Sequence, residues 1–215
     1  MLRNLISTEV FTILILVSLL LIASAKLIYP KRFSDFTSIV VNFKYLKMYA
    51  RDQKFLDGFE ALLFGNLVIG LAIFSYQFYN KSQIVSETSE LLLLKIGFAI
   101  ALFILIKVLL ERLISSVLNI DPIINSYLFQ KISYKNFIGL ILIPVNGILI
   151  YTISPNTLIF ISILSVLAIV NCIGSLSFFK RNQNIIKKNL FYFILYLCAL
   201  EISPYVILYK LITSI

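Results

Sequence analysis

The stretch LLLLKIGFAIALFILIKVLL, residues 91–110, is the strongest indication of the fold class of this chain. Only Lys95 and Lys107 are charged in this run of twenty residues. At a rise of about 1.5 Å per residue, an α-helix of this length crosses the hydrocarbon core of a bilayer, which is about 30 Å thick. Residues 91–110 therefore predict a transmembrane helix.

Five further apolar runs extend this prediction to the whole chain of 215 residues. They cover residues 9–29, 60–79, 136–153, 157–179 and 190–212. Runs of about twenty residues differ from the roughly ten-residue alternating strands of a membrane β-barrel. Hydrophobic residues make up 60% of the chain and charged residues only 13%, whereas soluble domains carry about 25% charged residues. The sequence predicts an all-α, polytopic bundle of six spans, forming one integral membrane domain in the lipid bilayer.

Lysine and arginine are distributed unevenly between the two sides of this bundle. Fourteen follow the first, third and fifth spans: Lys26, Lys31, Arg32, Lys44, Lys47, Arg51, Lys54, Arg112, Lys131, Lys135, Lys180, Arg181, Lys187 and Lys188. The opposite side carries three, Arg3, Lys81 and Lys210. Because cytoplasmic loops are enriched in basic residues, both termini are predicted to face away from the cytoplasm. The net charge of +9 then reflects topology and anionic headgroups rather than nucleic-acid binding.

The N-terminal segment allows an alternative interpretation. Arg3, the apolar run 10–22 and Ala23-Ser24-Ala25 resemble a secretory signal with its cleavage site. Cleavage would leave the basic connection that follows outside the cell unless the remaining topology inverted. Inversion would place the other two basic connections on the wrong side, so the six-span interpretation is favoured.

Two connections on the basic side have helical patterns. In residues 34–55 the apolar side chains Phe36, Ile39, Phe43, Leu46 and Ala50 recur at helical spacing, beside the basic stripe Lys44, Lys47, Arg51 and Lys54. This pattern predicts an interfacial amphipathic helix over 34–55 whose basic stripe contacts anionic lipid headgroups. Asp121-Pro122 predicts the start of a second, short helix through Phe129.

Polar groups within the apolar runs are the candidate functional residues, because ionisable groups at membrane depth are expensive. Glu201 lies near the middle of the last span, and Pro204 frees a backbone carbonyl beside it. Asn146 and Asn171 are predicted at a similar depth. Glu201 is expected either to be a structural hydrogen-bonding group, to handle a proton or an ion, or to anchor a partner helix.

Lys107 and Glu111 lie one helical turn apart near the inner end of the third span. This spacing predicts that they form an ion pair, or that Lys107 extends its ammonium group toward the interface. We expect a role in topology or packing for this pair.

No pattern for catalysis, cofactor binding or metal binding is found. Histidine is absent, which excludes bis-histidine haem sites, histidine-ligated zinc proteases and Ser–His catalysis. Cys172 and Cys198 both lie inside apolar runs, where cysteine packs as a small hydrophobe. The favoured function is a non-enzymatic accessory or scaffold component that binds partner membrane proteins. The alternatives are a small transporter or channel coupled at Glu201, and a lipid-modifying enzyme.

Three stretches carry a family resemblance: residues 29–33 (YPKRF), 139–144 (GLILIP) and 191–204 (FYFILYLCALEISP). Together they resemble an uncharacterised family of Bacteroidota inner-membrane proteins that is defined only as a domain of unknown function. The resemblance covers nearly the whole chain and implies an inner-membrane location with six spans. It implies no activity and transfers no catalytic residue.

Overall fold

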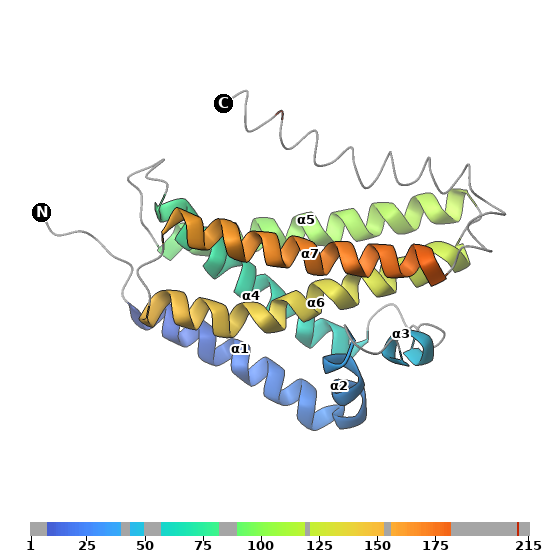
Figure 1. The fold of residues 1–215 in the computed structure, drawn as a ribbon, viewed down its shortest axis with the longest axis horizontal. Helices are drawn as coiled ribbons and strands as arrows, with labels where there is room; N and C mark the ends of the chain where they lie inside the picture. The colour runs from blue at the N-terminus through green and yellow to red at the C-terminus, as the bar shows by residue number, and fades with distance from the viewer. Residues whose placement is uncertain are drawn as a thin grey trace, which may run out of the picture.

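The computed structural model describes residues 8–39, 44–49, 57–81, 90–118, 121–152, 156–181 and 210. Within these ranges the chain is all-α, as predicted. The helices are α1 (Thr8–Ile28), α2 (Pro30–Thr37), α3 (Lys44–Tyr49), α4 (Gly58–Lys81), α5 (Glu90–Val117), α6 (Asp121–Tyr151) and α7 (Thr157–Arg181) (Figure 1). Five of them, α1, α4, α5, α6 and α7, are long and apolar enough to cross a membrane. The predicted sixth span, residues 190–212, lies outside the described residues.

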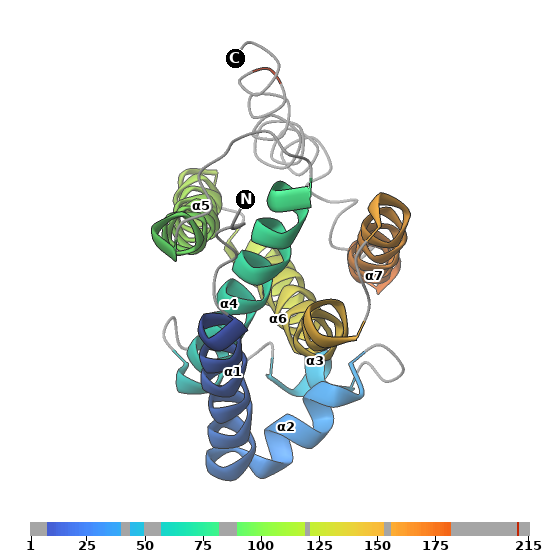
Figure 2. The same ribbon diagram turned by 90° about the vertical axis from the view of Figure 1, so that its left-hand side faces the viewer.

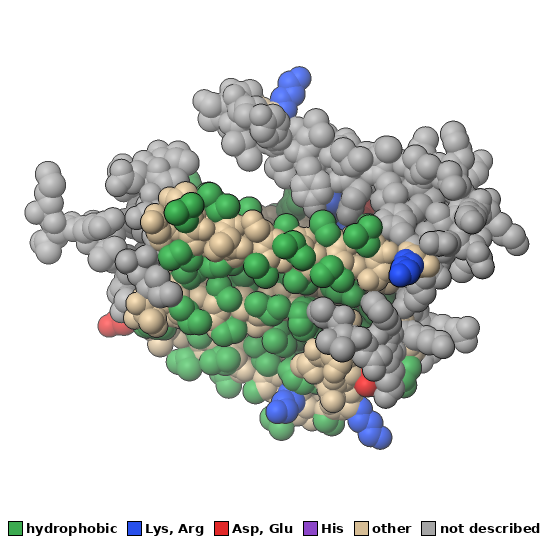
Figure 3. Space-filling view, viewed as in Figure 1, with side chains coloured by type: hydrophobic (Ala, Val, Ile, Leu, Met, Phe, Trp, Pro, Cys, Tyr) green, Lys and Arg blue, Asp and Glu red, His purple; other side chains and the backbone are tan. Residues whose placement is uncertain are grey.

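Helices α4 and α6 form the centre of the bundle. Figure 2 shows them between α5 and α7, with α1 packed on a further side. Exposed leucine, isoleucine and phenylalanine side chains cover the outer faces of α1, α5 and α7. Figure 3 shows one such face, where hydrophobic side chains run along the helices and charged ones lie near the edges. This surface fits a hydrocarbon environment, which confirms the prediction of a multi-pass membrane protein.

The chain bends sharply between α1 and α2. Pro30 occupies the first turn of α2, and Tyr29 before it has φ −127° and ψ 60°. A residue that precedes proline is pushed out of the helical region, so α1 ends at Ile28. The fixed φ of Pro30 then suits the start of a new helix. After eight residues α2 ends at Thr37, and a turn follows.

The predicted interfacial helix over 34–55 is wrong as a single element. The helix that includes Ser34 begins four residues earlier, at Pro30, and ends at Thr37, while α3 is separate. Phe36, Ile39 and Leu46 are fully buried and pack with Phe59 and other core residues. The described part of the apolar stripe therefore faces the protein's own core rather than lipid. The side chains of Lys44, Lys47, Arg51 and Lys54 lie outside the described residues, so headgroup binding stays a prediction.

The predicted short helix from Asp121 and the fourth span are one continuous helix of 31 residues, α6. The segment between them, residues 130–135, contains glutamine, serine and lysine and is predicted as a connection. In the fold, Gln130, Ser133 and Asn136 are buried against neighbouring helices. The Gln130 Nε2 donates to the carbonyl of Gly174 in α7 over 2.7 Å. Burial against protein, rather than against lipid, allows this polar half of α6 to continue the helix.

Glycine sets the closest approach between helices. A Cβ atom at Gly139 of α6 would lie 2.7 Å from the Leu67 Cα of α4, so the two backbones touch. On α4 two glycines face different neighbours. Gly65 lies against Leu21 of α1, and Gly70 lies against Leu142 of α6. Small residues at these positions let α4 pack closely on both sides.

Candidate functional site

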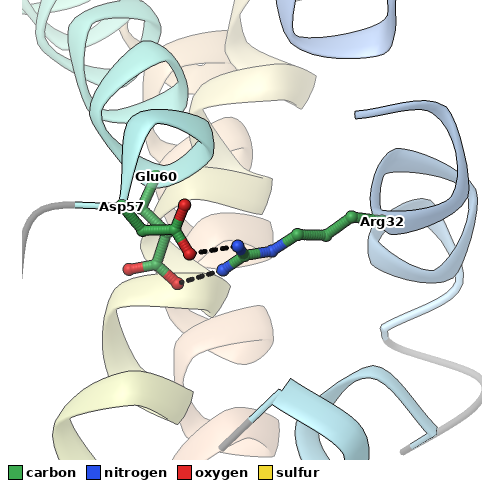
Figure 4. Close-up of polar contacts among 3 residues, drawn as sticks. All are labelled: Arg32, Asp57 and Glu60. Carbon is green, nitrogen blue, oxygen red and sulfur yellow. Dashed lines mark hydrogen bonds and ion pairs between the residues drawn. The ribbon is translucent and has the colours of Figure 1, made fainter. Parts of the chain in front are cut away.

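A charged cluster lies where α2 meets the start of α4. Arg32 on α2 forms a hydrogen-bonded ion pair through Nη1 with Oδ2 of Asp57, the residue before α4. Its Nη2 lies 3.6 Å from Oε1 of Glu60 in the first turn of α4. Figure 4 shows the arginine reaching from α2 across to both carboxylates. The guanidinium fork can address two acidic groups at once, which the single ammonium group of lysine does less well.

Three aromatic rings surround the same guanidinium. Its Cζ atom lies 4.8 Å from the ring centre of Phe59, 5.1 Å from that of Tyr49 and 6.0 Å from that of Tyr45. Arginine is attracted to aromatic faces at these distances. Because Tyr45 and Tyr49 belong to α3, Arg32 joins α2, α3 and α4 at one end of the bundle.

The electrostatics of this cluster favour a permanently charged arginine. Burial of the Arg32 guanidinium lowers its pKa, but Tyr45 and Asp57 raise it by more, so the pKa lies above its ordinary value. Burial also raises the pKa of the Tyr45 phenol, with a further contribution from the Glu60 carboxylate. At physiological pH Arg32 is therefore charged and Tyr45 neutral, which suits a fixed clamp between helices.

The sequence pattern indicates only a topological role for Arg32 and does not predict this cluster. Two signals were available. Pro30 marks a helix start that places Arg32 in the first turn of α2, and the acidic pair Asp57 and Glu60 stands directly before an apolar run. What could not be inferred is that α2 folds back toward α4, because that contact joins positions 25 residues apart.

Replacing Arg32 with alanine is expected to lower the free energy of unfolding by about 1–2 kcal/mol, because a part-exposed ion pair and a cation–π contact each contribute up to about 1 kcal/mol. The thermal unfolding midpoint of the protein in detergent measures this. Lys31→Ala is the matched control, since the neighbouring Lys31 is exposed. Equal midpoints for the two variants would refute the clamp.

A second charged cluster connects α5 and α6 within the spans. Glu111 is fully buried, and its Oε1 accepts a 2.6 Å hydrogen bond from the Lys131 Nζ. The Lys107 Nζ lies 4.0 Å from the same oxygen, and Lys107 is 5% exposed. The predicted Lys107–Glu111 pair is thus confirmed, in its buried form rather than with an ammonium group at the interface. Lys131, taken from the sequence as a loop residue, is the closer partner of Glu111.

The two asparagines that are predicted at a similar depth, Asn146 and Asn171, lie at different levels of the bundle. Asn146 lies five residues before the end of α6, and its Nδ2 donates to the Gly70 carbonyl of α4 over 2.8 Å. Asn171 lies fourteen residues after the start of α7 and donates to Leu167 of its own helix over 3.2 Å. Along the helices, Asn146 therefore lies about 13 Å closer to the connection between α6 and α7 than Asn171 does. The expectation of one shared layer is wrong, because Asn146 lies near the Tyr151 end of α6, whereas Asn171 lies in the middle of α7.

Glu201 and Pro204 lie outside the described residues, so a coupling role for Glu201 stays a prediction. Within the ranges that the structure describes, no group of three or more histidine, cysteine, aspartate and glutamate side chains could hold a metal ion. Cys172 is an exposed free thiol on α7. The two charged clusters join helices, because each of their carboxylates lies close to a cation on another element.

Comparison with known proteins gives a family and no characterised relative. No curated protein and no solved structure shows significant similarity to the chain. A family profile described as a domain of unknown function matches residues 11–212. This match begins within α1 and extends beyond α7, so it includes all the helices that contribute to both charged clusters. The chain therefore belongs to the family described as domain of unknown function DUF4271.

Proposed function

We propose that this protein is a non-enzymatic scaffold subunit of a bacterial inner membrane, of the Bacteroidota type, which holds partner membrane proteins through its spans. In this proposal the end that carries α2 and α3 faces the cytoplasm and both termini are periplasmic. The support for this orientation is the excess of lysine and arginine in the connections at that end.

The observation that carries the proposal is a continuous apolar stripe along α5. Six large side chains share one face at spacings of three and four residues, each at least 41% exposed: Leu94, Phe98, Leu102, Leu105, Leu109 and Leu113. Spacings of this kind place side chains in a single row, as in the seam of a coiled coil. Helix α5 has 28 residues and a length of about 42 Å, longer than one bilayer crossing requires.

The described charges support a structural rather than a catalytic function. Arg32 is engaged by Asp57, and Glu111 by Lys131, so these groups already lie beside opposite charges within the fold. The large cavity between α5 and α7, of about 730 Å³, is lined mainly by apolar side chains. Such surroundings suit helices or acyl chains better than a polar substrate, which needs converging polar groups.

The test compares two triple-alanine variants that remain apolar and so retain membrane insertion. One changes Phe98, Leu105 and Leu109 on α5, and the control changes Leu16, Leu20 and Leu27, which are exposed on α1. The protein is purified in a gentle detergent and co-purifying proteins are quantified by mass spectrometry. We expect a stoichiometric membrane-protein partner with the wild type and the α1 control, and at least a tenfold loss with the α5 variant.

Two results would contradict this proposal. Equal recovery of the partner with both variants would exclude the α5 stripe as the binding surface. An active monomer or homodimer with no stoichiometric partner would exclude the scaffold function itself and favour the transporter or the lipid-modifying enzyme.

A further inference from the structure

A single lysine interrupts the exposed apolar face of α5. Figure 2 shows α5 on the outside of the bundle, beside α4. Lys95 is exposed on this helix, five residues after its start at Glu90. Among the residues that the structure describes, it is the one exposed charged side chain that lies more than three residues inside a spanning helix. Neither a hydrogen bond nor an ion pair joins Lys95 to that part of the chain.

Lys95 belongs to a regular row of side chains along α5. Its apolar members are each at least 41% exposed, and the spacings along the row alternate between four and three residues. This alternation is the a and d pattern of a left-handed coiled coil, and left-handed packing is also common between membrane helices. Lys95 therefore occupies one core position of a heptad pattern. The row, which we call the α5 seam, consists of Leu91, Lys95, Phe98, Leu102, Leu105 and Leu109.

A helix that packs along the α5 seam also covers Lys95, because Leu91 and Phe98 lie on either side of it. The ammonium group then loses contact with water and lipid headgroups, and a charge in such surroundings requires an opposite charge nearby. Glu90 is five residues away, which places it about 140° around the helix axis from Lys95. The carboxylate must therefore come from the helix that covers the seam. A single polar residue at a core position of this kind fixes the register and the choice of partner.

A second copy of the chain does not provide this carboxylate. Copies of one membrane protein insert in the same orientation, so two α5 helices would pack in parallel. In a parallel pair, each core position faces its own counterpart. The two Lys95 ammonium groups would then lie at one depth and repel each other. The charge of the seam thus favours a different protein over self-association.

We propose that the α5 seam binds a transmembrane helix of a different protein, with an aspartate or glutamate of that helix beside Lys95. Lys95 lies four residues from the Leu91 end of the span, which places the partner's carboxylate about 6 Å inside it. This binding depends on the proposed scaffold function, since the seam shares four side chains with the apolar stripe of α5. The apolar members of the seam supply the contact area, and Lys95 selects which helix binds.

Photo-cross-linking in native membranes identifies what covers Lys95. In the full-length protein, Phe98 is replaced by the photoreactive analogue p-benzoylphenylalanine, and the cross-linked peptides are sequenced by mass spectrometry. We expect a transmembrane segment of another protein that contains an aspartate or glutamate within four residues of the cross-linked position. The same analogue at Leu20, which is exposed on α1, is the matched control and should give at least tenfold less of this product.

Three other cross-linking results would overturn the proposal. Products that join two copies of this chain would show that the seam is a homodimer surface. Products with lipid alone would show that Lys95 extends its ammonium group to the headgroups, as lysines near the ends of spans do. A partner segment that has no carboxylate near the cross-linked position would exclude the ion pair.

Charge variants of Lys95 test the ion pair by co-purification, with recovery normalised to the amount of variant in the membrane. Lys95→Glu should lower recovery of the partner at least tenfold, because it brings two carboxylates together, whereas Lys95→Arg should retain it within twofold. Lys26→Glu, near the exposed end of α1, is the matched control and should leave recovery unchanged. Changing the partner's carboxylate to lysine should restore its binding to the Lys95→Glu protein.

These results also distinguish failure of the ion pair from failure of the scaffold function. Full recovery of the partner with Lys95→Glu, together with its loss from the α5 triple-alanine variant, would refute the pairing and leave the scaffold function in place. Absence of a stoichiometric partner from the wild type would refute both.

Discussion

Replacing Glu111 with alanine is expected to lower the free energy of unfolding by about 3–5 kcal/mol, the cost of breaking a buried ion pair. The variant leaves Lys131 and Lys107 in the bundle without the carboxylate that both approach within 4.0 Å. Two ammonium groups would then repel each other in surroundings of low dielectric constant. Because stability differences of 1–2 kcal/mol already change abundance several-fold, the variant should nearly disappear from membranes.

Immunoblots of membrane fractions and thermal unfolding in detergent measure this effect. Glu9→Ala is the matched control, since Glu9 is exposed in the first turn of α1. The double variant Glu111→Gln/Lys131→Gln should be more stable than Glu111→Ala, because it also removes one of the two lysines. Wild-type abundance of Glu111→Ala would refute the view that this cluster holds α5 against α6.

Replacing Gly139 with valine is expected to lower the free energy of unfolding by about 3 kcal/mol, at the upper end of the range for overpacking. The new Cβ would lie 2.7 Å from the Leu67 Cα and 3.1 Å from its backbone nitrogen. Backbone atoms cannot move aside as a flexible side chain can. Helices α4 and α6 would therefore have to separate.

The matched control for this substitution is Gly147→Val on the same helix. A Cβ at Gly147 meets nothing within 4 Å, so that variant should unfold within about 0.5 kcal/mol of the wild type, as surface substitutions do. The thermal unfolding midpoint in detergent compares the two variants. A similar loss for both would mean that glycine matters here for helix flexibility rather than for close packing.

Sequence reasoning located the helices well where each span is uniformly apolar. The predicted spans 9–29 and 157–179 end within two residues of α1 and α7. It failed where polar residues face protein instead of lipid. Hydropathy predicts a connection for the segment containing Gln130 and Ser133, although both are buried residues of α6. Hydropathy measures transfer to lipid, and it does not describe a polar side chain that is hydrogen-bonded between helices.

The charged pairs of the candidate sites could be predicted only where both partners belong to one helix. The Lys107–Glu111 pair could be predicted because an α-helix places residues four apart on one face. The closer partner, Lys131, could not be predicted, since it belongs to another helix and lies 20 residues away. The Arg32 cluster was missed for the same reason, because Asp57 and Glu60 reach it only after α2 folds back on α4.

From the sequence alone it follows that this protein is a helical membrane protein and that five of its apolar runs form membrane-crossing helices. Backbone hydrogen bonds in a helix join residues four apart, and lipid requires every such bond to be made, so local composition is sufficient. Which helix faces meet is known only from the folded structure. The contact of Gly139 with Leu67 and the burial of Phe36 depend on shape complementarity between distant segments. Periodicity shows that a face is apolar, but packing decides whether lipid or protein covers it.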